Sequence, residues 1–546
     1  MKIRSTLLST GWLSLVGVLL AGCQPQQRPE PLQQGLIYCS EGNPESFNPQ
    51  LGTSGTTIDA TAAQLYDRLL DYDADEKRFL PALATDWQVL DDGHRYRFHL
   101  RHDVQFHHTD YFSPSRTFNA DDVLFSFRRW LDKNSAYHRV NGGSYPFFTA
   151  TGLDQLITAV TKVDDYTVDI ELQYSDSSFL ANLASDFAII LSAEYAQQLQ
   201  ANGYPERIDR LPIGTGPFVF EQFRKDVLIR YQRNPDYWRE GPYIEQLVYS
   251  ITPNANKRML KLLTGECDVI PYPLISEIDT LVDNRSIDVS SEISPNVAFW
   301  AFNTERPPFD DARVRRALSY AINQAAIIQA IYYGNAKQAD SLLPQTSWAF
   351  ANVSEAYEYN PARARQLLDE AGYGRLSIDI WAMPVQRAYN PNAYRMAELI
   401  QADLARIGVD AHIISYEWNT FRRRLARGEH DSVLIGWSAD NADPDNFFRP
   451  LLSCAAVATG NNRANWCNAA FDNIIFDAIS SSDREQRQRL YDRAQRLVAE
   501  QMPLVPIAHS LRYQASQASI SGIKPPAYGG ISFRQARIDR AATEEQ

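Results

Sequence analysis

The sequence has few of the residues from which catalytic and metal centres are built. Five of its 546 residues are cysteine and nine are histidine. It contains no G-x-S-x-G, H-E-x-x-H, P-loop or C-x-x-C motif, so the common hydrolase, zinc-protease, nucleotide-binding and thiol-redox patterns are absent. His107 and His108 are adjacent, and neighbouring residues of a strand point to opposite faces, which disfavours a shared metal ion. The sequence therefore predicts no enzyme activity, no cofactor and no metal.

Positive charge is also scarce. Lysine and arginine number 53 against 66 acidic residues, the net charge is −13, and no basic block interrupts the chain. This balance argues against a nucleic-acid partner and against binding to an anionic membrane face. Hydrophobic residues make up 44% and aromatic residues 12%, as in a globular protein. A chain of this length exceeds one hydrophobic core, so we expect two or three lobes.

The first 22 residues read as a secretory signal. Lys2 and Arg4 precede an apolar run, 7–21, that is short for a membrane-spanning helix. The run ends in L-A-G-C, which resembles a bacterial lipobox with cleavage before Cys23 and lipid on its thiol. The alternative is a plain signal peptide cut near Gly22. Residues 23–34 are polar and proline-rich, as in a tether. We expect a periplasmic, lipid-anchored protein of a Gram-negative cell.

Four cysteines remain in the mature chain: Cys39, Cys267, Cys454 and Cys467. An even number in an exported chain implies two disulfides, for which three pairings exist. Cys454 and Cys467 enclose a short polar loop and are predicted to pair with each other. That leaves Cys39 to pair with Cys267, which would tie two distant segments into one lobe.

The pattern of elements changes near Ile293. Before it, short strands and turns predict an α+β region with many antiparallel pairs. After it, a long helix is expected over 310–333, followed by strands at 376–381, 409–416 and 433–435 that alternate with helices at 392–407 and 421–426. Strand–helix–strand units of this kind predict a doubly wound α/β lobe.

The stretch 432–447 combines a buried strand with a cluster of acids. The apolar run 433–435 leads through Gly436 and Trp437 to Asp440, Asp443 and Asp445. Open α/β sheets bind ligands at the carboxyl ends of their strands, so an acid beside an indole here suits a ligand cation. The simpler interpretation is that these residues only form a turn. A calcium loop is disfavoured, because the Asp-x-Asp-x-Asp-Gly spacing and the distal Glu are missing.

A second charged side chain follows a neighbouring strand. The strand 376–381 breaks at Pro384 and delivers Arg387 into a loop. A guanidinium grips a carboxylate with two parallel hydrogen bonds, although an isolated Arg is more often a surface residue. Taken together, Asp440 would accept an ammonium group and Arg387 a carboxylate. This pair predicts a receptor for a zwitterion.

Several long motifs, in order along the chain, carry a family resemblance. They are Y-C-S-E-G-N-P-E-S-F-N-P-Q (38–50), L-A-T-D-W-x-V (83–89), Y-R-F-H-L-R (96–101), G-T-G-P-F (214–218), R-V-R-R-A-L-x-Y-A-I-N (313–323), W-A-M-P-V-Q-R-A-Y-N-P-N (381–392) and G-W-S-A-D-N-A-D-P-D-N-F-F (436–448). Together they resemble the extracytoplasmic solute-binding proteins of peptide ABC transporters, family 5, in particular their dipeptide-binding, haem-binding-lipoprotein and Sap-type branch.

The resemblance implies an α/β clamshell of the type II periplasmic-binding-protein class, with two ligand-binding lobes joined by a hinge and an extra domain. The first lobe is expected from 35–75, 205–295 and 505–546, the extra domain from 76–204, and the second lobe, which carries the ligand anchors, from 296–504. The family's disulfides match the cysteine pairing given above. The lipobox is closer to the lipoprotein branch than to the freely periplasmic receptors.

The resemblance also implies a function. The expected protein is a monomeric, non-enzymatic receptor that captures dipeptides or short peptides by their charged termini and delivers them to a membrane permease. The alternative is capture of haem or of an antimicrobial peptide, but the Sap-type branch does not generally have Arg at position 387, which favours dipeptides. The ligand-binding residues implied are Asp440, Arg387, Thr53, Trp437, Ser438, Ala439, Tyr389 and Trp418.

Overall fold

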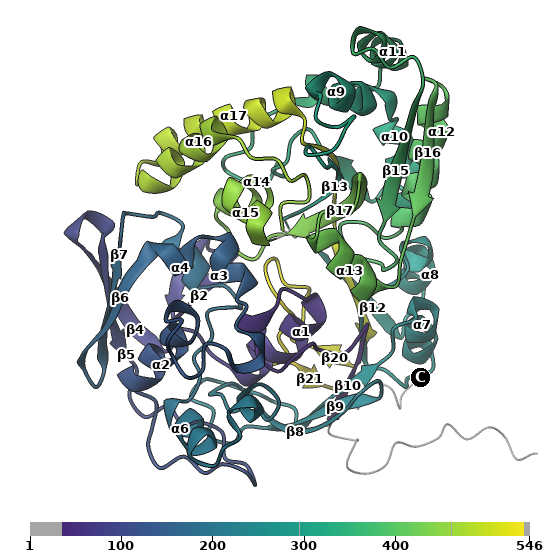
Figure 1. Ribbon diagram of the computed structural model, residues 1–546. Coiled ribbons are helices and arrows are strands. Elements are labelled where there is room, and N and C mark those ends of the chain that lie inside the picture. Colours follow the sequence, from purple (N-terminus) through teal and green to yellow (C-terminus); the bar gives the residue numbers. More distant parts are fainter. Residues whose placement is uncertain (1–34, 294, 460, 540–546) are drawn as a thin grey trace, which may run out of the picture.

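The computed structural model describes residues 35–293, 295–459 and 461–539. The predicted signal sequence, the lipidation site at Cys23 and the tether lie outside the described residues. The described strands form three large sheets and two short two-stranded ribbons. Figure 1 shows the three sheets set around a central region where helices α1 (Gly55–Leu65) and α13 (Trp418–Ala426) face each other. None of the described helices combines the length and the apolar character needed to cross a membrane.

The first lobe contains a seven-stranded sheet assembled from distant parts of the chain. Its order is β12-β19-β11-β1-β10-β9-β8. The first described strand runs parallel to β10 over its whole length, and β19 lies between β11 and β12. The strands are β1 (Gly35–Ser40), β8 (Phe218–Arg224), β9 (Leu228–Arg233), β10 (Gln246–Ile251), β11 (Val269–Pro271), β12 (Ile287–Glu292) and β19 (Arg512–Gln517).

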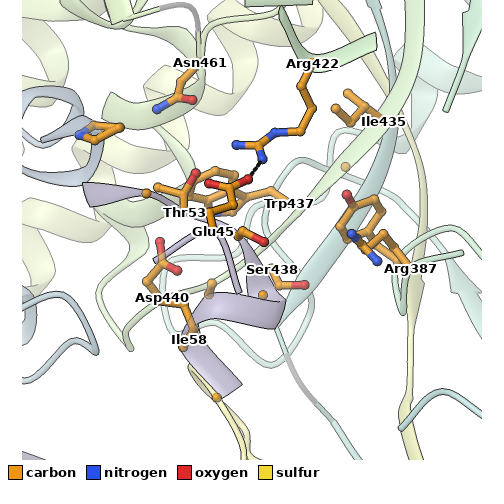
Figure 2. Close-up of a pocket in the computed structure, with 18 of the residues that line it drawn as sticks. Glu45, Thr53, Ile58, Arg387, Arg422, Ile435, Trp437, Ser438, Asp440 and Asn461 are labelled. Carbon is orange, nitrogen blue, oxygen red and sulfur yellow. Dashed lines mark hydrogen bonds and ion pairs between the residues drawn. The ribbon is translucent and has the colours of Figure 1, made fainter. Parts of the chain in front are cut away.

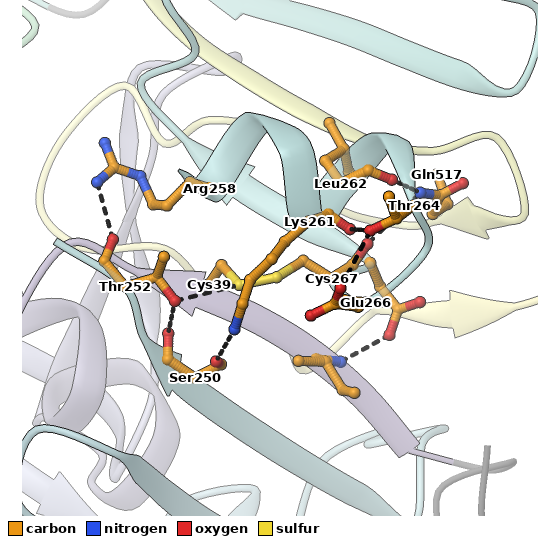
Figure 3. The surroundings of a disulfide bond; sticks show 12 residues. Cys39, Ser250, Thr252, Arg258, Lys261, Leu262, Thr264, Glu266, Cys267 and Gln517 are labelled. Carbon is orange, nitrogen blue, oxygen red and sulfur yellow. Dashed lines mark hydrogen bonds between the residues drawn. A yellow bond between two sulfur atoms is a disulfide. The ribbon is translucent and has the colours of Figure 1, made fainter. Parts of the chain in front are cut away.

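Two disulfides connect the cysteines in the predicted pairs. Cys39 in β1 is bonded to Cys267, which is 228 residues away and lies just before β11. Figure 3 shows this bond beside Thr252, whose hydroxyl donates to the Cys39 sulfur at 3.7 Å. Cys454 is bonded to Cys467, with a Cα–Cα distance of 4.4 Å. The first disulfide holds the first described strand to a segment more than two hundred residues later in the same lobe, as the sequence predicts.

The extra domain is a four-stranded antiparallel sheet with its own core. The strand order is β4-β5-β7-β6, where β4 is Ala84–Leu90, β5 is Arg95–Leu100, β6 is Ile157–Asp164 and β7 is Thr167–Leu172. Helix α2 (Ala120–Leu131) covers it and begins with a capping box in which the side chains of Asn119 and Asp122 satisfy the first free backbone N–H groups. Phe98, fully buried, marks the core of this domain.

The second lobe contains a six-stranded sheet in the order β14-β18-β13-β17-β15-β16. β15 (Leu376–Ala382) runs parallel to both β16 (Val409–Ile414) and β17 (Ser432–Ser438), and the helices α12 (Ala393–Ala405) and α13 connect these three strands. This confirms the strand–helix–strand pattern expected from the sequence. The remaining strands are β13 (Asn296–Phe302), β14 (Ala336–Gln338) and β18 (Leu504–Ser510).

Two details differ from the sequence expectation. β18 pairs with β13 in the second lobe, so the chain crosses back to the first lobe between Ser510 and Arg512, and the expected boundary at 505 was placed too early. The long helix expected over 310–333 is two helices, α9 (Ala312–Ala321) and α10 (Gln324–Tyr332). Asn323 separates them because its side chain accepts the N–H of Ala326 and caps the second helix.

The two lobes are joined by two short connections and touch at several further points. One connection lies between β12 and β13 and the other between β18 and β19, and Asn296 links them by donating to the Ser510 carbonyl at 2.7 Å. On the far side of the cleft, Arg449 of the second lobe pairs with Asp176 of the extra domain at 3.1 Å and donates to the Ser178 hydroxyl at 2.6 Å. The clamshell described here is therefore closed.

Candidate functional site

A cavity of about 660 Å³ lies between the two lobes. The first lobe lines it with the loop and helix between β1 and β2 (Leu70–Asp73) and with a loop near the C-terminus. The second lobe lines it with the ends of β15 and β17 and with α13, and the extra domain contributes Pro146 and Phe187. All eight residues expected from the sequence to bind ligand line this cavity: Asp440, Arg387, Thr53, Trp437, Ser438, Ala439, Tyr389 and Trp418.

Asp440 follows directly after β17 and is half-buried in the wall of the cavity (Figure 2). Its backbone N–H donates to Asn446 Oδ1 at 3.0 Å, and the Asn446 amide donates weakly to its carboxylate at 3.5 Å. No cation among the described residues forms an ion pair with it. Burial raises the pKa of Asp440 to about 7, the Asn446 hydrogen bond opposes this rise, and the nearby Asp186 carboxylate adds to it.

Trp437 is fixed by the same asparagine. Its indole N–H donates to Asn446 Oδ1 at 3.0 Å, so Asn446 holds both the indole and the backbone of Asp440. Asn446 lies in the short 3-10 helix Pro444–Phe447, which follows the turn after β17. Asn446 therefore positions Trp437 and Asp440 in the wall of the cavity.

The other two acids of the cluster do not line the cavity. Asp443 accepts two hydrogen bonds from Arg487 at 2.8 Å, and Asp445 pairs with Arg449. No group of three or more potential metal ligands occurs among the described residues. Only Asp440 of the three offers its carboxylate to the cavity.

Arg387 reaches the cavity on the side opposite Asp440, as Figure 2 shows. Its Nη1 donates to Glu41 of the first lobe at 2.8 Å, and its guanidinium lies 5.3 Å from the centroid of the Trp418 ring. Both charged side chains of this pair are mostly buried, at 18% and 13% exposed. Nε and Nη2 make no hydrogen bond to the described residues, so the planar fork keeps two donors for a ligand.

The electrostatics of Arg387 differ from those of Asp440. Burial works to lower the pKa of Arg387, but Glu41 and the Tyr389 phenol outweigh it, and the pKa is raised above its usual value. The guanidinium is therefore permanently charged and already carries a counter-ion across the cleft.

Tyr389 packs against Gly436 in the middle of the cavity wall. A Cβ atom built at Gly436 would lie 2.3 Å from Tyr389 Cδ2 and 2.3 Å from the Val297 carbonyl oxygen, so only glycine fits. The absence of a side chain at 436 therefore lets the Tyr389 ring pack directly on the backbone of β17. Glycine at 436 was read from the sequence only as a strand boundary, and its role here is to make room for an aromatic wall.

The sequence analysis missed several charged residues of the cavity. Glu45 of the first lobe forms an ion pair with Arg422 of α13, which Figure 2 shows as a bridge across the cavity. Arg512 lies 3.8 Å from Asp59. The others are Glu41, Arg423 and Arg463. Glu41 and Glu45 fall within the 38–50 motif, which could have drawn attention to them, whereas the four arginines stand in no motif that singles them out.

Comparisons with known proteins agree with this architecture. Residues 78–459 match the family model of the bacterial extracellular solute-binding proteins, family 5 middle. The chain is 44% identical to the dipeptide-binding protein of Escherichia coli, over 98% of this chain and 99% of the relative. It is 40% identical to heme-binding protein A of Haemophilus influenzae, over 99% and 100%.

A solved structure is equally similar. The dipeptide binding protein from Pseudoalteromonas sp. SM9913, in complex with Met-Leu, superposes with a TM-score of 0.90 at 50% identity and covers 92% of this chain and 100% of its own. The two-lobed clamshell and the family expected from the sequence are thus confirmed. The chain belongs to the bacterial extracellular solute-binding proteins of family 5.

Proposed function

We propose that this protein is the receptor of an ABC importer and captures dipeptides or short peptides by their charged termini. One observation carries the proposal: an unpaired carboxylate, Asp440, and a guanidinium with free donors, Arg387, lie on opposite sides of one interlobe cavity. A peptide's ammonium group would bind the first and its terminal carboxylate the second. The similarity to proteins named as dipeptide-binding supports the same ligand class.

The geometry gives a physical basis for selecting length rather than sequence. Two opposite charges at a fixed separation fit one backbone length, and a longer or shorter zwitterion leaves one charge unpaired. Exclusion of water from the closed cavity strengthens both pairings. Thr53, Trp437, Ser438, Ala439, Tyr389 and Trp418 would form the walls around the backbone and side chains.

Closure of the clamshell is the second part of the mechanism. The lobes that close are residues 35–75, 205–293 and 511–539 on one side and 296–510 on the other, with the extra domain, 76–204, attached to the first. The ion pairs of Arg387 with Glu41 and of Arg422 with Glu45 join the lobes when they are together. A bound peptide adds its own contacts to both sides and shifts the population toward the closed form, which a membrane permease would recognise.

Blocked peptides test the proposal directly. Isothermal titration calorimetry with Ala-Ala, N-acetyl-Ala-Ala and Ala-Ala amide separates the two termini. We expect each block to cost about 2–5 kcal/mol of binding free energy, because it leaves one buried charge without a partner. Tri-alanine and free alanine serve as length controls. Equal affinity for Ala-Ala and its acetylated form would contradict the assignment of Asp440.

Haem is the second candidate ligand. The similarity to heme-binding protein A and the aromatic residues Tyr389, Trp418 and Trp437 around the cavity favour it. It predicts a Soret band in the purified protein and in protein titrated with haem. A titration without any shift of that band, together with dipeptide binding, would leave the peptide as the ligand.

The remaining expectations concern location and partners. Members of this family are extracellular solute-binding proteins, and the present chain acts without catalysing a reaction of its ligand. Cleavage before Cys23 and lipidation of its thiol would hold the protein at the membrane as a monomer near its permease. The mass of the mature N-terminal peptide, compared with that of a Cys23→Ala variant, tests the anchor.

A further inference from the structure

The loop between Cys454 and Cys467 in the second lobe is held by several contacts around Arg463. The disulfide Cys454–Cys467 closes it, and Arg463 lies within it. The Arg463 carbonyl accepts a hydrogen bond from His430 Nε2 at 2.7 Å. The preceding residue, Asn462, is buried and donates to the carbonyls of Ser453 and Trp466 at 3.2 and 2.8 Å. The backbone on both sides of Arg463 is therefore rigid.

The guanidinium of Arg463 lines the cavity and has no anionic partner. Its Nη1 is buried without a hydrogen bond, and its side chain makes no ion pair or hydrogen bond with the described residues. Burial lowers the pKa of Arg463 to about 10, and the neighbouring Arg422 lowers it further. A partly buried guanidinium without a counter-ion is costly, since it cannot lose its charge by deprotonation at neutral pH.

The other arginines that line the cavity have anionic or polar partners. Arg387 pairs with Glu41, Arg422 with Glu45, and Arg512 lies beside Asp59. Arg423 is exposed and bonds to the Thr420 hydroxyl. Arg463 is thus a partly buried cation of the cavity that the described part of the chain leaves without a counter-ion.

The position of Arg463 places it toward one end of the cavity. His430, which bonds to the Arg463 carbonyl, precedes β17, and its ring centroid lies 6.0 Å from that of Trp381 in β15, the strand that leads to Arg387. Asp440, by contrast, lies beyond the opposite end of β17. Arg463 therefore belongs to the Arg387 end, where the carboxyl-terminal residue of a bound peptide would lie.

We propose that Arg463 receives the side-chain carboxylate of the carboxyl-terminal residue of a bound peptide, so that the protein prefers dipeptides ending in Asp or Glu. This inference rests on the proposed function, because Asp440 and Arg387 must first take the two termini. A neutral dipeptide leaves Arg463 unpaired, whereas an acidic side chain in that position supplies the missing anion. The planar fork suits a carboxylate with two parallel hydrogen bonds.

Calorimetry with Ala-Glu, Ala-Gln and Glu-Ala tests the preference. We expect the wild-type protein to bind Ala-Glu about tenfold or more tighter than Ala-Gln, in keeping with a charge-assisted pair. In Arg463→Gln this ratio should fall to about one while Ala-Gln binds as before. Glu-Ala, with its acid at the other residue, should respond to the variant no more than Ala-Gln does.

Two further variants make the outcome specific. Arg427→Gln removes the same charge from an exposed position outside the cavity lining and should keep the full Ala-Glu preference. Arg463→Lys keeps the charge and should retain part of the Ala-Glu preference. The melting temperature of Arg463→Gln should not fall, since the variant removes an uncompensated charge.

The possible failures are distinguishable. If the wild-type protein binds Ala-Gln and Ala-Glu equally, the inference is wrong and the proposed function stands. If Arg463→Gln weakens both peptides alike, Arg463 holds the terminal carboxylate or only supports the fold, and the inference is again wrong. If no dipeptide binds, both the proposed function and the inference are wrong.

Discussion

Asp440 and Arg387, at the two ends of the cavity, differ in how their charges are compensated when no ligand is bound. Asp440 has no counter-ion among the described residues, and its pKa is raised to about 7, so it can become neutral by taking up a proton. Arg387 cannot lose its charge, and it keeps Glu41 as a partner from the facing lobe. The Asp440 carboxyl can lose its charge by protonation, whereas the Arg387 guanidinium keeps its charge and relies on Glu41. The difference predicts which substitutions affect binding only and which also affect stability.

The largest effect is expected from Asp440→Asn. The variant should lose about 2–5 kcal/mol of Ala-Ala binding free energy, because the peptide ammonium then enters the cavity without an anion. The empty protein should melt at the same or a higher temperature at pH 8, where the wild-type carboxylate is charged and poorly solvated. Calorimetry and differential scanning fluorimetry measure the two quantities. A large drop in melting temperature would show that Asp440, like Arg387, stabilises the empty protein, contrary to the difference proposed here.

Glu41→Gln tests the opposite end. It leaves Arg387 without its counter-ion, so the free energy of unfolding of the empty protein should fall by about 1–3 kcal/mol. Saturating Ala-Ala should recover more stability in this variant than in the wild type, since the peptide carboxylate replaces the lost anion. The matched control is Glu245→Gln, which removes an exposed partner of Arg233 in the same lobe. Equal melting temperatures for the two variants would show that Arg387 needs no counter-ion.

The pH dependence of Ala-Ala binding distinguishes Asp440, which can take up a proton, from Arg387, which stays charged. The folded-state pKa of Asp440 is raised to about 7. Between about pH 4 and 7 the native state therefore holds a proton on Asp440 that the unfolded chain has lost. The contribution of this residue to the free energy of unfolding falls as pH rises through that window. A bound ammonium group needs the ionised form, so Ala-Ala affinity should rise with pH up to about 7, by at most about tenfold per unit. Calorimetry in buffers of different ionisation enthalpy measures the released proton. In Asp440→Asn the rise should shrink to the part contributed by Asp59, a cavity-lining carboxyl whose pKa burial raises to about 6.

The smallest effect is expected from Glu45→Gln. The pair of Glu45 with Arg422 also joins the lobes, but the carboxylate is 43% exposed and solvent screens it. Its loss should change Ala-Ala affinity by about 0–1 kcal/mol, and less at high salt. Calorimetry at low and high ionic strength checks this value. An effect as large as that of Glu41→Gln would mean that burial does not distinguish the two bridges.

Much of the site could be predicted from local patterns. The run 433–435 followed by polar residues indicated a strand that ends at Asp440, and the Pro384 break indicated that Arg387 follows a neighbouring strand. Parallel strands place their carboxyl ends together, so these two positions had to meet at one edge. The same reasoning predicted the pairing of Cys454 with Cys467.

The rest depended on contacts that local patterns do not encode. Glu41 and Arg387 are 346 residues apart, and only closure of the two lobes brings them together. The polar loop after Cys454 gave no sign that it presents a cation to the cavity. The helix break at Asn323 was missed because the apolar periodicity continues across it, and the boundary at 505 was misplaced because β18 and β19 follow each other with one residue between them.

The placement of β19 has a consequence for how the chain is made. Its neighbours β11 and β12 are synthesised more than two hundred residues earlier, yet they belong to one continuous sheet only after residues 512–517 pair with both of them. Contacts of such long range are slow to form. A nascent chain emerging from the ribosome or from a secretion channel would therefore complete its second lobe while the first still lacks an inner strand, and β12 would join the seven-stranded sheet only after β19.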